Sequence, residues 1–199
     1  MASRKPRTVM YRRKREHKTS YPKRLKLLLS GKKRMVVRLT NSRVIAQLVE
    51  FTLKGDKILV GVDSFALRKY GWKYSCKNIP AAYLTGFLLG RKAKDKKFKD
   101  TSVLDTGLNY PQHKGRIYAF LKGALDAGIS VPHGETDLFP EEKKIQGQHV
   151  QEYGEKIKGN KDVYERQFAQ YLKSNSAPEN MAAAFTQVKQ KITGQTKNE

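Results

Sequence analysis

The side chains best suited to binding chemistry are the cations and tyrosines at the start of the chain. Residues 1–34 contain 14 lysines and arginines and one acid, Glu16, so they carry a net +13 of the chain's +23. Such a segment repels itself and has little apolar surface to bury, so it is not expected to fold alone. Its cations suit phosphates, while Tyr11 and Tyr21 offer flat faces for unpaired bases. The composition therefore predicts a polyanionic partner.

A targeting segment or a solubilising tail would also account for a basic run of this kind. A secretory signal requires an apolar core of about 7–15 residues after its charges, and the run has none. A mitochondrial presequence is also rich in Arg and poor in acids, but Pro6 and Pro22 interrupt the helical periodicity here. The basic character also continues into the body of the chain. We therefore favour nucleic-acid binding over both.

Three aspartates are the main candidates for catalysis. Asp63, Asp105 and Asp126 lie near the ends of expected strands or of a helix. Two or more carboxylates that converge on magnesium are the requirement for two-metal phosphodiester chemistry. No neighbouring Glu or His reinforces them, and aspartates at such positions commonly cap helices or shape turns. A magnesium-dependent nuclease is therefore only a minor alternative.

Histidine and cysteine do not supply a second candidate centre. His113 and His133 lie in expected loops, and Cys76 is the only cysteine, which excludes an internal disulfide. The sequence lacks the C-x-x-C, H-x-x-x-H and H-E-x-x-H spacings of zinc sites. It also lacks a Walker loop, a G-x-G-x-x-G motif and a Ser/His/Asp signature. We therefore expect no enzyme activity, no metal, no cofactor and no small-molecule substrate.

A length of 199 residues allows one ordinary domain with extensions. The net positive charge decreases from the N-terminal to the C-terminal part of the chain. Residues 35–134 contain 17 lysines and arginines against 7 acids, whereas residues 135–199 contain 10 of each. No apolar run is long enough to cross a membrane. We divide the chain into a basic arm (1–34), an α/β core domain (35–134) and a helical C-terminal extension (135–199).

Apolar periodicity predicts the elements of the core domain. Turn residues at 41–43 and 53–56 separate three strands that form an antiparallel meander. Two helices then alternate with two short strands, and helical crossovers of this kind add parallel strands to a sheet. The fold class is α/β, with a mixed sheet packed by helices. The expected strands are Met35–Thr40, Val44–Thr52, Lys57–Val62, Ser102–Asp105 and Ile129–Val131, and the expected helices are Ala81–Lys94 and Arg116–Ala127. Small residues in the first helix, including Gly86 and Gly90, predict close packing against the sheet.

Helices are also predicted on both sides of the core domain. Residues 22–30 place Leu25, Leu28 and Leu29 on one face that anchors the arm, with Lys23, Arg24 and Lys26 pointing outward. The C-terminal extension reads as three amphipathic helices over residues 141–157, 162–173 and 178–192. The last of these has an apolar stripe of Met181, Phe185, Val188 and Ile192.

Aromatic residues alternate with lysines in the segment Ser64–Asn78, which is expected to be a loop or irregular turn. Tyr70, Trp72 and Tyr74 lie two residues apart and are flanked by Lys69, Lys73 and Lys77. A loop of this kind can stack on unpaired bases. Trp72 can equally close the edge of the core while its lysines stay in solvent. The sequence does not separate these two interpretations.

Three stretches together resemble one protein family. KLLLSGKKRMVVRLTNSRVIAQLVEF, KNIPAAYLTGFLLGRKA and GRIYAFLKGALDAGISVPHGETDLFP resemble the archaeal form of large-subunit ribosomal protein eighteen, whose eukaryotic counterpart is large-subunit protein five. The resemblance runs in order from about Tyr11 to Tyr171. The extension after Asp137 is similar to that of the archaeal and eukaryotic branch.

The resemblance implies a structural protein of the cytoplasmic ribosome. It implies binding to 5S rRNA, attachment of 5S rRNA to the large rRNA in the central protuberance, and neighbouring ribosomal proteins as partners. A non-specific architectural binder of RNA or DNA is the alternative. The RNA-binding residues that the resemblance implies are Arg7, Tyr11, Arg12, Arg13, Arg15, Lys18, Thr19, Tyr21, Arg24 and Lys26 in the arm, Arg34, Arg38, Asn41, Ser42 and Arg43 at the first hairpin, and Trp72, Lys73, His113, Lys114 and Arg116 elsewhere.

Overall fold

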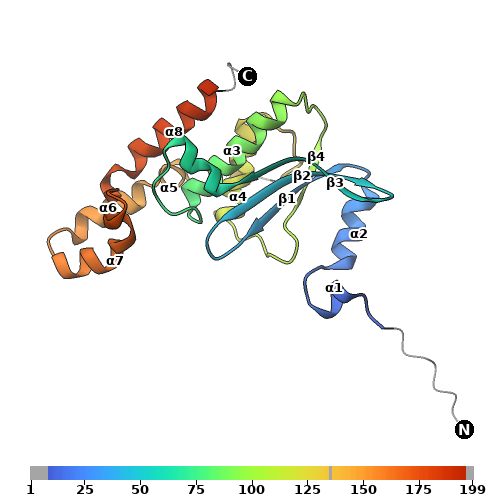
Figure 1. The fold of residues 1–199 in the computed structure, drawn as a ribbon, viewed down its shortest axis with the longest axis horizontal. Helices are drawn as coiled ribbons and strands as arrows, with labels where there is room; N and C mark the ends of the chain where they lie inside the picture. Colours follow the sequence, from blue (N-terminus) through green and yellow to red (C-terminus); the bar gives the residue numbers. More distant parts are fainter. Residues whose placement is uncertain (1–8, 135, 196–199) are drawn as a thin grey trace, which may run out of the picture.

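A computed structural model describes residues 9–134 and 136–195 of the chain (Figure 1). Its centre is a four-stranded sheet with the strand order β3-β2-β1-β4. β1 (Lys33–Leu39), β2 (Val44–Thr52) and β3 (Gly55–Asp63) are antiparallel neighbours, while β4 (Ser102–Asp105) pairs in parallel with β1. The predicted combination of a meander and a parallel crossover is therefore confirmed.

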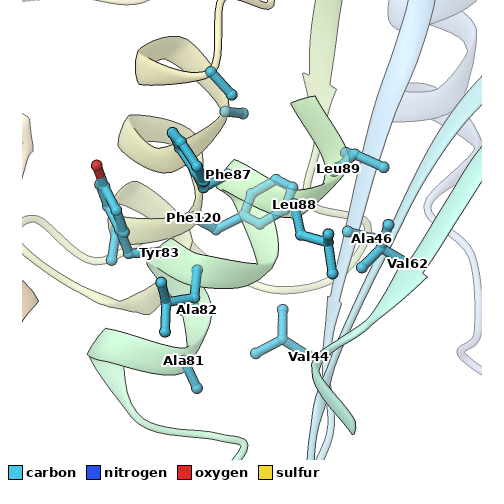
Figure 2. Close-up of a cluster of buried hydrophobic side chains, with 14 of the residues drawn as sticks. Val44, Ala46, Val62, Ala81, Ala82, Tyr83, Phe87, Leu88, Leu89 and Phe120 are labelled. Atoms are coloured by element: carbon cyan, nitrogen blue, oxygen red, sulfur yellow. The ribbon is translucent and has the colours of Figure 1, made fainter. Parts of the chain in front are cut away.

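Two helices cover one face of this sheet. α3 (Ile79–Asp95) begins at Asn78, whose side-chain oxygen accepts a hydrogen bond from the Ala81 amide at 2.9 Å. From α3, Leu88 and Leu89 point toward Ala46 and Val62 of the sheet (Figure 2). α4 (Arg116–Asp126) packs closely against α3. The sheet, α3 and α4 thus share one buried cluster.

The glycines of α3 serve the contact with α4 rather than the predicted contact with the sheet. A Cβ atom at Gly86 would lie 2.0 Å from the carbonyl oxygen of Phe120, and one at Gly123 of α4 would lie 2.1 Å from that of Tyr83. Neither position has room for a side chain, so the two backbones touch directly. The prediction of close packing is right, but its partner is the second helix.

Two sequence predictions in the core domain need correction. The segment Ser64–Tyr70 is a 3-10 helix (η1), not an irregular loop. Ile129–Val131 is not a strand, although the Ser102 amide donates a hydrogen bond to the Ser130 carbonyl at 2.9 Å. Gly128, with φ of 96°, and Pro132 bound this segment and leave too few residues for a ladder. Ile129 and Val131 are buried nonetheless, which explains why their pattern resembles a strand.

The C-terminal extension folds back on the core domain. Its elements are η2 (Thr136–Leu138), α5 (Glu142–Gln146), α6 (Gln148–Ile157), α7 (Lys161–Lys173), η3 (Pro178–Asn180) and α8 (Met181–Gln195). The single helix predicted over residues 141–157 is divided at Gly147, whose φ is 85°. A Cβ atom at Gly147 would lie 2.7 Å from the sulfur of Met181, so the break brings α5 and α6 against the start of α8.

The apolar stripe predicted for the last helix is confirmed. Met181, Phe185, Val188 and Ile192 of α8 are at most 4% exposed and belong to the same buried cluster as the sheet. Lys189 adds a polar contact, because its ammonium donates to the Tyr83 hydroxyl at 2.9 Å and lies 5.1 Å from the centre of that ring. No helix among the described residues is long and apolar enough to span a membrane.

The arm contributes two helices on the far side of the sheet from α3. These are α1 (Arg12–Arg15) and α2 (Tyr21–Leu29). Figure 1 shows α1 and α2 at one end of the molecule and α6 and α7 at the opposite end. The short helix predicted over residues 22–30 is confirmed, whereas α1 was not expected from the sequence.

Candidate nucleic-acid interface

The outer face of the sheet carries charged residues at alternate positions of β1. Met35 and Val37 point into the core, so Arg34, Val36 and Arg38 point to the opposite face. Val36 pairs with Asp105 of β4, which brings a carboxylate between the two arginines. This face is the surface across which α2 lies.

Two aspartates organise the arginines of this face. Asp105, 5% exposed, is 3.0 Å from Arg34 Nη1 and 3.4 Å from Arg38 Nη2 through its two carboxylate oxygens. Arg38 Nη1 also donates to the Asp105 carbonyl at 2.9 Å. Asp56 of β3 is 2.8 Å from Arg34 Nη2 and 2.9 Å from Arg24 Nη2 of α2. Burial alone would raise the pKa of Asp56, but the bonds from Arg34 and Arg24 outweigh it and lower that pKa.

Arg34 therefore has a structural role on this face of the sheet. Its side chain is 3% exposed, and both terminal nitrogens lie beside carboxylates. The sequence offered no sign of this, because the pairing of Arg34 with Asp56 and Asp105 depends on strand register. Asp56 and Asp105 are the residues that sequence reasoning missed as organisers of the interface.

Polar contacts, not leucines, hold α2 on the sheet. The Lys23 ammonium donates to the Thr106 hydroxyl at 2.8 Å and to the Gly107 carbonyl at 3.2 Å. Arg24 adds the ion pair with Asp56. No residue of α2, which the structure describes throughout, is buried, and Leu25 and Leu29 are 58% and 77% exposed. Of the expected leucine anchor, only Leu28 is half-buried, and it does not join the buried cluster, while Lys23 and Arg24 turn toward the sheet instead of outward.

The part of the arm before α2 is held by local contacts. The rings of Tyr11 and Tyr21 lie 5.4 Å apart between centres. Arg13 Nε donates to the Thr19 hydroxyl at 2.8 Å, and Lys18 pairs with Glu16 at 2.9 Å. The predicted contacts Arg12, Arg15 and Lys26 are exposed, whereas Arg7 lies outside the described residues. The exposed cations of this segment are thus ordered around two tyrosines.

A hollow of about 550 Å³ lies between this arm and the outer face of the sheet. We call it the arm hollow. Apolar side chains such as Val36 and Ile58 form part of its wall. Its charged lining residues are six cations and two acids, namely Arg13, Lys18, Lys23, Arg24, Arg34, Arg38, Asp56 and Asp105. The excess of positive charge makes it a site for anionic groups.

The first hairpin presents a second set of predicted residues. Asn41 and Ser42 are exposed in the turn between β1 and β2, which the Thr40 hydroxyl closes by accepting a bond from the Arg43 amide at 3.0 Å. Arg43 pairs with Asp63 at 2.6 Å, and its guanidinium lies 5.2 Å from the centre of the Phe65 ring. Arg43 keeps 42% of its side chain exposed, so it remains accessible.

The remaining predicted residues divide into buried and exposed groups. Trp72 is 1% exposed, and its indole Nε1 donates to the Ser75 carbonyl at 3.1 Å, so it packs in the core and offers no stacking face. Lys73, His113, Lys114 and Arg116 are exposed. Lys114 pairs with Asp137 at 3.2 Å, and Arg116 Nη1 donates to the Lys77 carbonyl at 3.3 Å. Of the two interpretations of the 64–78 segment, the structure supports packing for Trp72.

Two comparisons identify the chain's relatives. The family described as "Ribosomal large subunit proteins 60S L5, and 50S L18" matches residues 5–102. The large ribosomal subunit protein uL18 of Methanococcus maripaludis is 45% identical over 184 residues, which cover 92% of this chain and 94% of that protein. The chain belongs to the L5/L18 family of large-subunit ribosomal proteins. The resemblance seen in the sequence, including its archaeal character, is confirmed.

Family membership bears on the catalytic candidates, because this family consists of structural ribosomal proteins, which are not enzymes. Each of the three aspartates has a structural partner. Asp63 accepts from the Phe65 amide at 2.9 Å and caps η1, and Asp126 accepts from the Tyr83 hydroxyl at 2.6 Å. Asp105 holds the arginines of β1. Their positions near strand and helix ends are thus accounted for within the L5/L18 fold.

Proposed function

We propose that this chain is a structural constituent of the large ribosomal subunit that binds 5S rRNA. It helps to attach 5S rRNA to the large rRNA in the central protuberance, beside neighbouring ribosomal proteins in the cytoplasmic ribosome. The observation that carries the proposal is the arm hollow, where cations from the arm and from the sheet meet in one place. Family membership supports the ribosomal role.

The exposed members of the predicted set fit two kinds of contact. Cations of the arm and of the hollow suit phosphates, and Tyr11, 74% exposed, suits stacking on an unpaired base. Asn41 and Ser42, at the tip of the hairpin, suit hydrogen bonds to phosphates or base edges. We add Lys23, which lines the arm hollow, to the predicted residues that are exposed or half-buried. The proposed contacts are therefore Tyr11, Arg12, Arg13, Arg15, Lys18, Thr19, Tyr21, Lys23, Arg24, Lys26, Arg38, Asn41, Ser42, Arg43, Lys73, His113, Lys114 and Arg116.

The two acids of the outer face give this interface its shape. Asp56 and Asp105 fix Arg24, Arg34 and Arg38, so that part of the cationic surface is in place before RNA arrives. A fixed arrangement of cations distinguishes one folded RNA from another, whereas mobile cations respond mainly to charge density. Specificity for 5S rRNA is therefore the property that the experiment must measure.

A competition filter-binding assay tests this proposal. Labelled 5S rRNA is bound to the full chain at moderate salt and displaced by unlabelled 5S rRNA, tRNA or duplex DNA. We expect 5S rRNA to compete at least about tenfold better than the others, because loops and bulges carry most of the specificity in RNA recognition. Equal competition by all three would instead support a non-specific architectural binder and reject the proposal.

A further inference from the structure

A second concave surface lies where the core domain meets the C-terminal extension. Two hollows of about 770 and 620 Å³ adjoin there, since both have Ser75, Lys77 and Tyr171 in their walls. One reaches Asn41 in the first hairpin turn, and the other lies along α6 and α7. We call the two together the junction trough. Among the residues that the structure describes, it shares no lining residue with the arm hollow.

The charged side chains that line the junction trough are all positive. Arg116 lines one hollow, Arg166 lines the other, and Lys77 lines both. No Asp or Glu is found among the described residues of its wall, although residues 135–199 contain 10 acids. The acids among the described residues of the extension thus lie outside this wall. Three cations in a concave wall without a carboxylate create a positive potential that favours an anionic occupant.

Aromatic rings face this positive trough. The backbone of α7 leaves helical geometry at Phe168, where φ is −107° and ψ is 18°. Phe168 is buried, and its ring lies 6.1 Å from that of Tyr153 and 5.9 Å from that of Tyr171. Tyr153 keeps 44% of its surface exposed. Phe168, at the kink, thus packs against Tyr153, while the exposed part of the Tyr153 ring remains available to a ligand.

We propose that the junction trough binds a single-stranded segment of RNA. Its phosphates lie against Lys77, Arg116 and Arg166, and its bases lie against Tyr153 and the amides of the wall, which include Asn41, Asn109 and Gln167. Cations spaced along a groove with interleaved aromatic rings suit a nucleotide chain. Protein interfaces instead concentrate apolar residues at the centre and charges at the rim. This proposal rests on the proposed function, since it takes the RNA to be ribosomal.

The test compares two charge reversals in the full chain. The trough variant carries Lys77→Glu and Arg166→Glu. The matched control carries Lys156→Glu and Lys161→Glu, the same change of charge at two exposed positions of the extension outside the trough wall. A third variant, Tyr153→Leu, keeps the apolar contact with Phe168 but removes the aromatic face. Circular dichroism is used to check that all three variants fold.

The probe is a short oligouridine that contains 4-thiouridine, cross-linked by light and mapped by mass spectrometry. We expect cross-links in α6 and α7 in the native chain and the control, and a loss of about tenfold in the trough variant and severalfold in Tyr153→Leu. Equal cross-links in all variants, or cross-links confined to residues 9–34, would reject the trough as an RNA site and leave it to a protein partner. If the cross-links are equal in all variants while the native chain still prefers 5S rRNA in the filter assay, the proposed function stands and this inference fails. If the native chain shows no such preference, the proposed function itself fails.

Discussion

The helices α2, in the arm, and α8, in the C-terminal extension, are attached to the core domain in opposite ways. α8 inserts Met181, Phe185, Val188 and Ile192 into the buried cluster. α2 buries none of its residues and is held by Lys23 and Arg24 through hydrogen bonds and one ion pair. Salt does not screen apolar burial, whereas exposed ion pairs weaken as salt or a competing polyanion is added. We therefore expect α8 to contribute to the stability of the fold, and the attachment of α2 to weaken as salt or a polyanion is added.

The sharpest test of this contrast removes one large apolar side chain from each helix. Phe185→Ala in α8 should lower the free energy of unfolding by about 3–5 kcal/mol, because the side chain is 4% exposed. Leu29→Ala in α2 should change it by less than about 0.5 kcal/mol, because Leu29 is 77% exposed. Urea denaturation measures both. Similar losses for the two variants would show that α2 is also attached by apolar packing.

The outer face of the sheet, on which α2 lies, should nevertheless depend strongly on one buried acid. Asp105→Ala leaves the Arg34 guanidinium, 3% exposed, with Asp56 as its remaining acid, so we expect a loss of about 3 kcal/mol. Asp100→Ala is the control, because Asp100 pairs with Lys33 but is 59% exposed. Its loss should stay below about 1 kcal/mol. If both variants unfold at the same urea concentration, Asp105 does not organise the outer face.

Removal of the first 20 residues should affect binding rather than folding. The buried cluster begins at Met35, so the truncated chain should keep its stability within about 1 kcal/mol. It loses eight lysines and arginines, so we expect roughly 100-fold weaker 5S rRNA binding and a flatter dependence of affinity on salt. Filter binding between low and moderate salt measures both quantities. Unchanged affinity after truncation would make the arm a solubilising segment.

The same contrast explains how far the sequence could predict the molecule. The stripe of α8 was predictable, because spacings of four, three and four residues place its apolar side chains on one face. α2 has a comparable leucine pattern, yet Leu25 and Leu29 remain exposed. A short apolar stripe predicts a helix but does not show whether another element of the fold buries that stripe. The contacts of Lys23 and Arg24 required the register of β3 and β4, which no local pattern contains.

The candidate interface was predictable in part. Charge and spacing pointed to the arm and the hairpin, where Tyr11, Asn41 and Ser42 are exposed, and their contact with RNA stays a prediction. Arg34 and Trp72 are buried in the fold, and residue type alone does not separate a buried arginine or tryptophan from an exposed one. The structural roles of Asp56 and Asp105 were missed because they depend on arginine partners that strand register brings together.

The smallest effect that the comparison predicts is acid sensitivity in the seat of α2. The bonds from Arg34 and Arg24 lower the pKa of Asp56 below its usual 3.8 in the folded chain despite partial burial. The stabilisation is therefore complete above the unfolded pKa and is lost as the pH falls through the lower, folded pKa. Because Asp56 is 31% exposed, we expect Asp56→Asn to cost only about 1 kcal/mol at pH 7 and less below about pH 4. Urea denaturation between acid and neutral pH measures this difference, and faster amide exchange in α2 should accompany it. A difference that stays constant down to the lowest pH would show that Asp56 holds α2 without its charge.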